Sequence, residues 1–280
     1  MNSERSTVNG KSGGRPAYRL PWTVHAFCCL TASPLVGQIQ DNSFLIEEAY
    51  NQEAGVVQHI SAFARSNGGD WAYSFTQEWP LGGIRHQLSY TIPLEHGDAI
   101  GTGIGDIGLN YRYQLLGHPE ARTVMAPRFS LLLPTGSEVA GRGTGTVGFQ
   151  GNLPLTIVPE PRFAFHANAG FTVTPSAKSP AGGKATTFSR NVGASLIWLV
   201  RPSVNLLVEA LWLRDESALG DGITSAEETT FISPGIRAAF DVGGGLQIVP
   251  GIGYTVAVSP NSAEDGVFLY LSFEHPFKRQ

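Results

Sequence analysis

Charged side chains are scarce in this sequence. Asp, Glu, Lys and Arg make up 15% of its 280 residues, against about a quarter in an average soluble domain. The formal net charge is -4 and no stripe of Lys or Arg appears, so the sequence lacks the electrostatic footprint of nucleic-acid binding. The two cysteines, Cys28 and Cys29, are adjacent and lie near the N-terminus. We therefore expect neither a disulfide framework nor a cysteine metal site.

Long apolar runs are also missing beyond residue 36, so no membrane-spanning helix is expected there. One apolar run, from Leu20 to Leu35, follows a polar stretch that contains several Arg and Lys residues. This layout predicts a signal peptide over residues 1–38, although no clear small-residue motif marks its cleavage site. A signal anchor is the alternative. If the chain spans a membrane after this segment, it does so with strands.

Large apolar residues occupy every second position through most of residues 56–277, and helical periodicity is absent. Phe163 and Phe165, for example, alternate with Ala164 and His166. Such a pattern predicts strands with two different faces. It recurs in about twelve segments, most of them long enough to cross a bilayer when tilted. The last segment resembles the C-terminal assembly signal of outer-membrane barrels.

The connections between these segments alternate in length, which distinguishes a membrane barrel from a soluble sandwich. Short links, expected to face the periplasm, lie at residues 79–83, 158–162, 200–203 and 241–245. Longer polar connections, expected to be extracellular loops, lie at residues 95–103, 135–145, 175–186, 215–228 and 259–266. We therefore predict an all-β fold over residues 56–277: a transmembrane, antiparallel, up-and-down β-barrel of the outer-membrane type with about 12 strands.

This architecture implies the bacterial outer membrane as the location. The expected partners are outer-membrane lipid and lipopolysaccharide, the barrel-assembly machinery and small-molecule solutes, and not nucleic acid. The seven histidines are scattered without H-x-H or H-x-x-x-H spacing, and no Ser/His/acid set stands out. We therefore expect no metal site, no cofactor and no enzymatic activity.

Ionisable residues on spanning strands are expected to face the lumen, because contact with lipid is costly. Two interpretations stay open: a salt-bridged network that fixes the barrel, or direct contact with permeating solutes. The candidates for the lumen or for solute contact are Glu47, Glu48, Glu78, Arg112, Arg128, His166, Glu209 and Arg237.

Residues 39–55 precede the first spanning strand and form a periplasmic or lumen segment. Within it, residues 43–53 mix apolar side chains with three carboxylates. We expect this stretch to fold into or across the periplasmic mouth and to set Glu47 and Glu48 near Arg112 or Arg128. A plain periplasmic strap is the alternative.

Two stretches, DNSFLIEEAYNQE at residues 41–53 with GVVQH at 55–59, and GDIGLNYRY at 105–113, resemble the MetA-pathway of phenol degradation family. The resemblance covers residues 41–277. Members are described as outer-membrane transporters near aromatic-degradation pathways. The resemblance therefore implies a porin-like channel or transporter for passive uptake of small, aromatic or hydrophobic solutes. A structural or interaction barrel with a filled lumen and no transport is the alternative.

Overall fold

A computed structural model of the chain describes residues 43–259 and 264–277, so the predicted signal peptide over residues 1–38 lies outside the described residues. Within the described part, no helix is long and apolar enough to cross a membrane. The strands are β1 Val56–Ser66, β2 Trp71–Pro80, β3 His86–Gly97, β4 Gly101–Ile104, β5 Ile107–Tyr113, β6 Thr123–Met125, β7 Arg128–Leu133, β8 Gly148–Glu160, β9 Phe163–Lys178, β10 Lys184–Arg201, β11 Val204–Gly220, β12 Ile223–Ala238, β13 Phe240–Gly243, β14 Leu246–Ala257 and β15 Gly266–Pro276.

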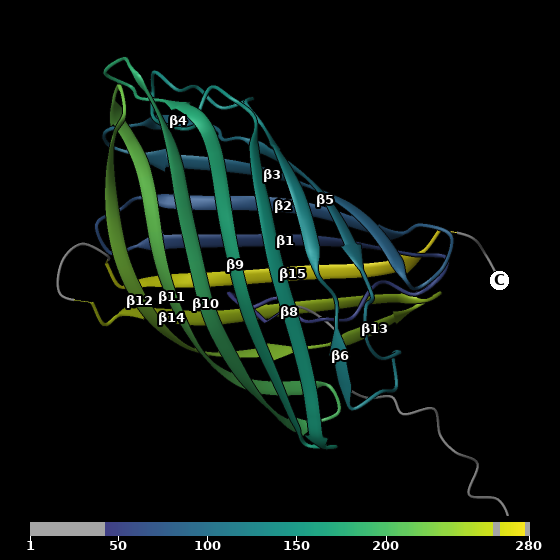
Figure 1. The fold of residues 1–280 in the computed structure, drawn as a ribbon. Coiled ribbons are helices and arrows are strands. Elements are labelled where there is room, and N and C mark those ends of the chain that lie inside the picture. Colours follow the sequence, from purple (N-terminus) through teal and green to yellow (C-terminus); the bar gives the residue numbers. More distant parts are fainter. Residues whose placement is uncertain (1–42, 260–263, 278–280) are drawn as a thin grey trace, which may run out of the picture. The chain divides into compact units, whose positions relative to one another are not determined.

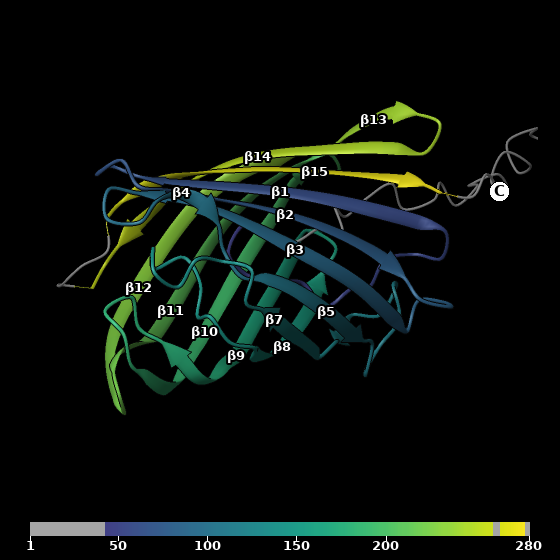
Figure 2. The ribbon, with the colours of Figure 1, turned by 90° about the horizontal axis from the view of Figure 1, so that it is seen from above.

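These strands form one antiparallel sheet that closes on itself (Figures 1 and 2). Strands pair in chain order, and β15 returns to pair with β1. Three of the crossings consist of two pieces each: β4 with β5, β6 with β7, and β12 with β13. The fifteen strands therefore make twelve crossings of a closed barrel. The predicted all-β barrel and its strand number are confirmed.

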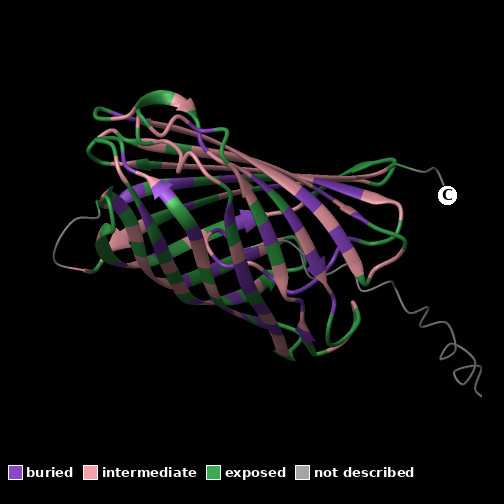
Figure 3. Ribbon diagram, turned by 45° about the horizontal axis from the view of Figure 1, so that its top comes forward, coloured by how far each residue is buried: buried purple, intermediate pink, exposed green. Residues whose placement is uncertain are grey.

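Through most of the barrel wall the two faces of a strand differ in polarity, and burial alternates along the strand (Figure 3). On the outer face, Phe165 and Leu196 are 36% and 47% exposed, whereas the inward-facing His166 and Glu209 are each 1% exposed. An apolar outer face suits lipid, and a closed ladder leaves no unpaired strand edge in the hydrocarbon region. The barrel wall therefore meets both requirements for crossing a membrane with strands.

Four short turns lie at one end of the barrel, at residues 81–85, 161–162, 202–203 and 244–245. They confirm the predicted short links, and short turns mark the periplasmic end of such barrels. The first and last strands meet at this end, where Val56 pairs with Pro276. A link at residues 114–122 also lies here and was not predicted.

At the opposite, extracellular end, three predicted loops are wrong. Residues 95–103, 175–186 and 215–228 are mostly strand. The actual links are residues 98–100 between β3 and β4, residues 179–183 between β9 and β10, and residues 221–222 between β11 and β12. Beyond the membrane both faces of a strand meet water, so polar residues replace the apolar face while the hydrogen-bond ladder continues. The alternation that identifies a strand in sequence is lost there.

Candidate functional site: the plugged lumen

Residues 43–53, which we call the plug, run along the inside of the barrel from the periplasmic end. Ile46, Ala49 and Tyr50 are 1%, 0% and 6% exposed. Near the periplasmic turns, Asn51 Nδ2 donates to the carbonyl of Ile84 at 2.9 Å. The plug therefore occupies the lumen, instead of lying across the outside of the mouth as a strap.

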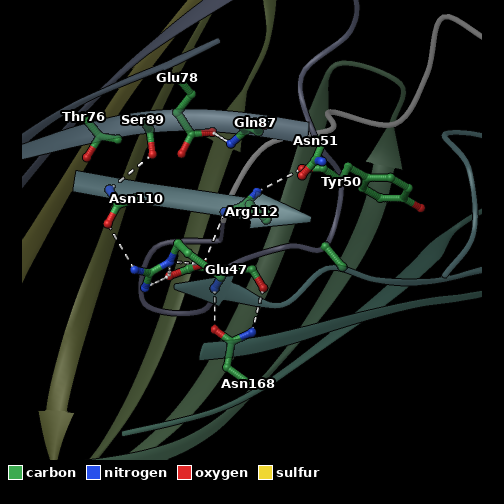
Figure 4. Close-up of polar contacts among 12 residues, drawn as sticks. Glu47, Tyr50, Asn51, Thr76, Glu78, Gln87, Ser89, Asn110, Arg112 and Asn168 are labelled. Atoms are coloured by element: carbon green, nitrogen blue, oxygen red, sulfur yellow. Dashed lines mark hydrogen bonds and ion pairs between the residues drawn. The ribbon is translucent and has the colours of Figure 1, made fainter. Parts of the chain in front are cut away.

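The main chain of the plug is held by lumen side chains. Oε1 of Glu209 accepts hydrogen bonds from the amides of Leu45 and Ile46 at 3.0 and 3.1 Å. Asn168 accepts from the amide of Glu47 at 2.8 Å and donates to its carbonyl at 2.9 Å (Figure 4). Buried amides without a partner would cost free energy. Further plug amides donate to the side chains of Thr156, Gln114 and Gln87.

An ion-pair cluster fixes the middle of the plug to β5 and β7. Glu47 accepts from Arg112 Nη2 at 3.2 Å and from Arg128 Nε at 3.0 Å. Arg112 also donates to the carbonyl of Tyr50 at 3.0 Å (Figure 4). The Arg112, Arg128 and Glu47 side chains are 4%, 15% and 23% exposed. Charge-assisted hydrogen bonds with this little exposure are stronger than surface ion pairs.

The ion pairs make seating of the plug sensitive to acid. Burial raises the pKa of Glu47, but the guanidiniums of Arg128 and Arg112 outweigh this effect and lower the pKa from 4.5 to about 2. Because the pKa of Glu47 is lower in the seated plug, the ion pairs stabilise the seated plug fully when the pH is above 4.5, the ordinary pKa of the carboxyl group. This stabilisation is lost as the pH falls toward about 2. We expect conductance to stay low from about pH 7 to about pH 5 and to rise as the pH falls toward about 2. Constant conductance down to that pH in a folded barrel would contradict this expectation.

The ring of Phe44 packs into a socket made of glycines. It lies against Gly235, Gly251 and Gly253 on β12 and β14, and a Cβ on Gly251 or Gly253 would come within 2.6 or 2.9 Å of ring atoms. On its other side the ring stacks on Phe268, with centroids 5.4 Å apart. Glycine in a strand often marks such a close approach. Apolar contact therefore holds the N-terminal part of the plug.

We expect Gly251→Ala to weaken the seating of the plug, because the new methyl group must displace the Phe44 ring. Overpacking of this kind costs about 1–3 kcal/mol. Gly108→Ala is the matched control, since a Cβ there meets no atom closer than 3.5 Å. Protease cleavage of the plug should accelerate in Gly251→Ala and not in the control. If Gly251→Ala accelerates cleavage as strongly in a Phe44→Ala background as in the wild type, the assigned clash is wrong.

A cavity of about 310 Å³ lies on the extracellular side of the plug. Its walls differ in chemistry. One wall is apolar and consists of Phe44, Leu45, Ile60, Ala62 and Tyr270. The other carries hydroxyl and amide groups from Ser74, Thr76, Ser89, Thr91 and Asn110. The hydroxyls of Thr76 and Thr91 are 2.9 Å apart, and Asn110 donates to Ser89 at 3.2 Å.

The loop at residues 134–147 is fixed at the extracellular end of this cavity by Asp106. One carboxylate oxygen of Asp106 accepts from the amide of Gly136 at 3.0 Å. The other accepts from the amide and the hydroxyl of Thr144, each at 2.9 Å. Asp106 itself lines the cavity. A tethered loop therefore lies at the extracellular side of the cavity, and the plug lies at its periplasmic side.

The structure divides the predicted lumen residues into two groups. The cavity is lined by Glu47, Glu78, Arg112 and Arg128. The residues that do not line it, each at most 5% exposed, are Glu48, His166, Glu209 and Arg237. In this second group, Glu209 binds plug amides, and His166 Nδ1 lies 2.8 Å from the hydroxyl of Thr156. Within residues 43–259 and 264–277, no group of three or more His, Cys, Asp or Glu residues is placed to hold a metal ion.

A closed antiparallel barrel with an apolar outer face and a polar, plugged lumen is a bacterial outer-membrane β-barrel. The chain belongs to the family whose model is described as "Putative MetA-pathway of phenol degradation" and which matches residues 37–273. No curated protein matches the sequence.

Among solved structures, an outer membrane channel from Pseudomonas putida F1 is similar with 16% identity and a TM-score of 0.63, over 81% of this chain and 97% of that chain. The β domain of the Bordetella autotransporter BrkA has 14% identity and a TM-score of 0.43, over 79% and 98%. The monoaromatic hydrocarbon channel CymD has 12% identity and a TM-score of 0.42, over 81% and 90%. The first likeness shows the fold, and the other two carry no argument.

Proposed function

We propose that the chain is an outer-membrane channel for passive uptake of small aromatic or otherwise hydrophobic solutes, with the plug as its periplasmic closure. The observation that carries this proposal is the cavity beside the plug. Its volume of about 310 Å³ is at the lower end of typical ligand pockets. The apolar wall suits a ring, and the adjoining wall offers hydrogen-bonding groups. The family description, which refers to phenol degradation, supports this class of solute.

The charges of the cavity favour uncharged solutes. Arg112 and Arg128 face the cavity, and the carboxylate of Glu47 lies between them. The carboxylates of Glu78 and Asp106 line the cavity as well, so the two guanidinium charges are compensated. An anion would have to compete with these built-in partners. In this proposal Glu47, Glu78, Arg112 and Arg128 contact the solute at the edge of the cavity, and the aromatic rings of Phe44 and Tyr270 contact its apolar part.

The proposal also includes removal of residues 1–38 as a signal peptide, insertion by the barrel-assembly machinery and contact with lipopolysaccharide in the outer leaflet. An apolar belt closed without free edges requires a lipid environment. Passive flux needs only displacement of the plug and a solute gradient.

The test is conductance of the purified protein in planar bilayers with phenol, benzoate or glucose added. We expect small discrete current steps that phenol blocks more strongly than benzoate or glucose. If the folded barrel passes no current, and if phenol does not change the fluorescence of the protein, the chain would instead be a structural barrel. Equal block by all three solutes would retain a channel and reject the proposed solute class.

A further inference from the structure

Two histidines meet where the barrel closes. His59 lies on β1 and His275 on β15, the first and last strands, which run side by side (Figure 1). Their Nε2 atoms are 3.3 Å apart, although the residues are 216 positions apart in sequence. The ring centroids are 5.4 Å apart and the ring planes differ by 17°. Because the centroids are farther apart than the Nε2 atoms, these nitrogens point toward each other.

This separation matches that of two imidazole ligands on one metal ion. A zinc ion binds histidine nitrogens at about 2.0–2.1 Å, so two ligands at a tetrahedral angle lie about 3.3–3.4 Å apart. A hydrogen bond from an N–H group more often spans about 2.9–3.0 Å. The observed 3.3 Å corresponds to a weak hydrogen bond between the rings in the metal-free protein, and it equals the spacing that a shared ion requires.

The second nitrogen of His275 has a partner that orients the ring for metal binding. Its Nδ1 lies 3.3 Å from the carbonyl oxygen of Pro276. A proton on Nδ1 donates to this carbonyl and leaves Nε2 with a free lone pair. A backbone carbonyl behind the ligand is a common arrangement for metal-binding histidines.

His59 is held in place before any ion binds. Its ring stacks on Phe273 with centroids 4.6 Å apart and lies 6.0 Å from the ring of Phe75. Its neighbour Ile60 faces the cavity, so His59 faces outward near the periplasmic end. Little side-chain freedom is lost when a ligand that is already packed binds a metal.

We infer that His59 and His275 form a two-histidine site for a divalent transition-metal ion such as Zn²⁺, Ni²⁺ or Cu²⁺, with water completing the coordination. Imidazole suits these ions, whereas Mg²⁺ and Ca²⁺ prefer oxygen ligands. The two ligands come together only when β1 pairs with β15, so the ion binds the closed barrel in preference to the unfolded chain. Binding therefore stabilises closure by linkage.

The first test is thermal unfolding of the purified protein in detergent, with Zn²⁺, Ni²⁺ or Mg²⁺ added. We expect Zn²⁺ and Ni²⁺ to raise the unfolding midpoint and Mg²⁺ to leave it unchanged. His59→Asn and His275→Asn each remove one ligand, so each should abolish the shift. His86→Asn is the matched control, because His86 lies on β3 and its Nδ1 is 2.7 Å from the hydroxyl of Tyr111; this variant should retain the shift.

The second test is the electron paramagnetic resonance spectrum of bound Cu²⁺, which reports coordinating nitrogens without depending on unfolding. We expect two imidazole nitrogens in the wild type and loss of this signature in either histidine variant. A shift that survives in His59→Asn, or a Cu²⁺ spectrum without imidazole nitrogen, would overturn the site. Either outcome leaves the channel proposal untouched, because both histidines lie outside the lumen.

Discussion

Deletion of residues 43–53 is expected to raise the single-channel conductance by roughly tenfold or more, because a barrel of this strand number has space for a water path once its lumen is cleared. The plug lines the periplasmic side of the cavity and is its proposed closure, and the described strands pair around the barrel without it. The deletion should therefore leave a folded barrel, detected by its β-sheet circular dichroism, that conducts. Unchanged conductance in a folded deletion variant would show that the plug does not close the path.

A reversible control uses a disulfide between the plug and the wall. The hydroxyls of Ser43 and Ser195 are 2.8 Å apart, so cysteines at both positions can be oxidised into one bond. No other cysteine follows residue 38. The oxidised Ser43→Cys, Ser195→Cys variant should stay closed even at acid pH, and reduction should restore the behaviour of the wild type. Opening of the oxidised variant would mean that the path avoids the plug.

Glu47→Gln is the second change with a large expected effect, because it removes the one carboxylate that contacts both Arg112 and Arg128. Removing one member of a buried pair costs about 3–5 kcal/mol. The Glu47 side chain is 23% exposed, and screening reduces the cost here to about 1–3 kcal/mol. We expect the plug to leave its site at least about ten times as often as in the wild type. We also expect the open state to favour anions, because the two guanidiniums then face the lumen.

Reversal potentials in a salt gradient measure this selectivity, and protease cleavage measures release of the plug. Glu53→Gln is the matched control, because this substitution removes the same charge from the same segment. The Glu53 side chain is exposed. Equal effects of the two substitutions would mean that total charge, and not the contact with Arg112 and Arg128, seats the plug.

The barrel itself follows from local features of the sequence. Each spanning strand separates lipid from lumen, so Phe165 and His166 must point in opposite directions and the alternation survives in the sequence. Ionisable residues such as Arg112 and Glu209 could be assigned to the lumen for the same reason. The extents of β9 to β12 could not be predicted, because the projecting ends meet water on both faces and lose the pattern.

The contacts of the plug were only partly predictable. Opposite charge pointed to Glu47 with Arg112 or Arg128, and these pairs are present. Asn168 and the glycine socket of Phe44 gave no such signal. A neutral amide is common at any inward position, and a glycine in a strand does not identify the ring that approaches it. These contacts depend on the register between distant strands, which one sequence does not reveal.

The charge of the plug has an electrical consequence. Residues 43–53 carry three carboxylates, at Glu47, Glu48 and Glu53, and no Lys or Arg, and the loop tethered through Asp106 holds the opposite end of the cavity. One full charge moved through 100 mV changes the free energy by about 2.3 kcal/mol. A potential that is positive on the periplasmic side pulls this negatively charged segment out of the lumen toward the periplasm. The reverse potential holds the segment in the lumen. In the proposed channel we therefore expect rectification, with current passing more readily under one polarity than under the other.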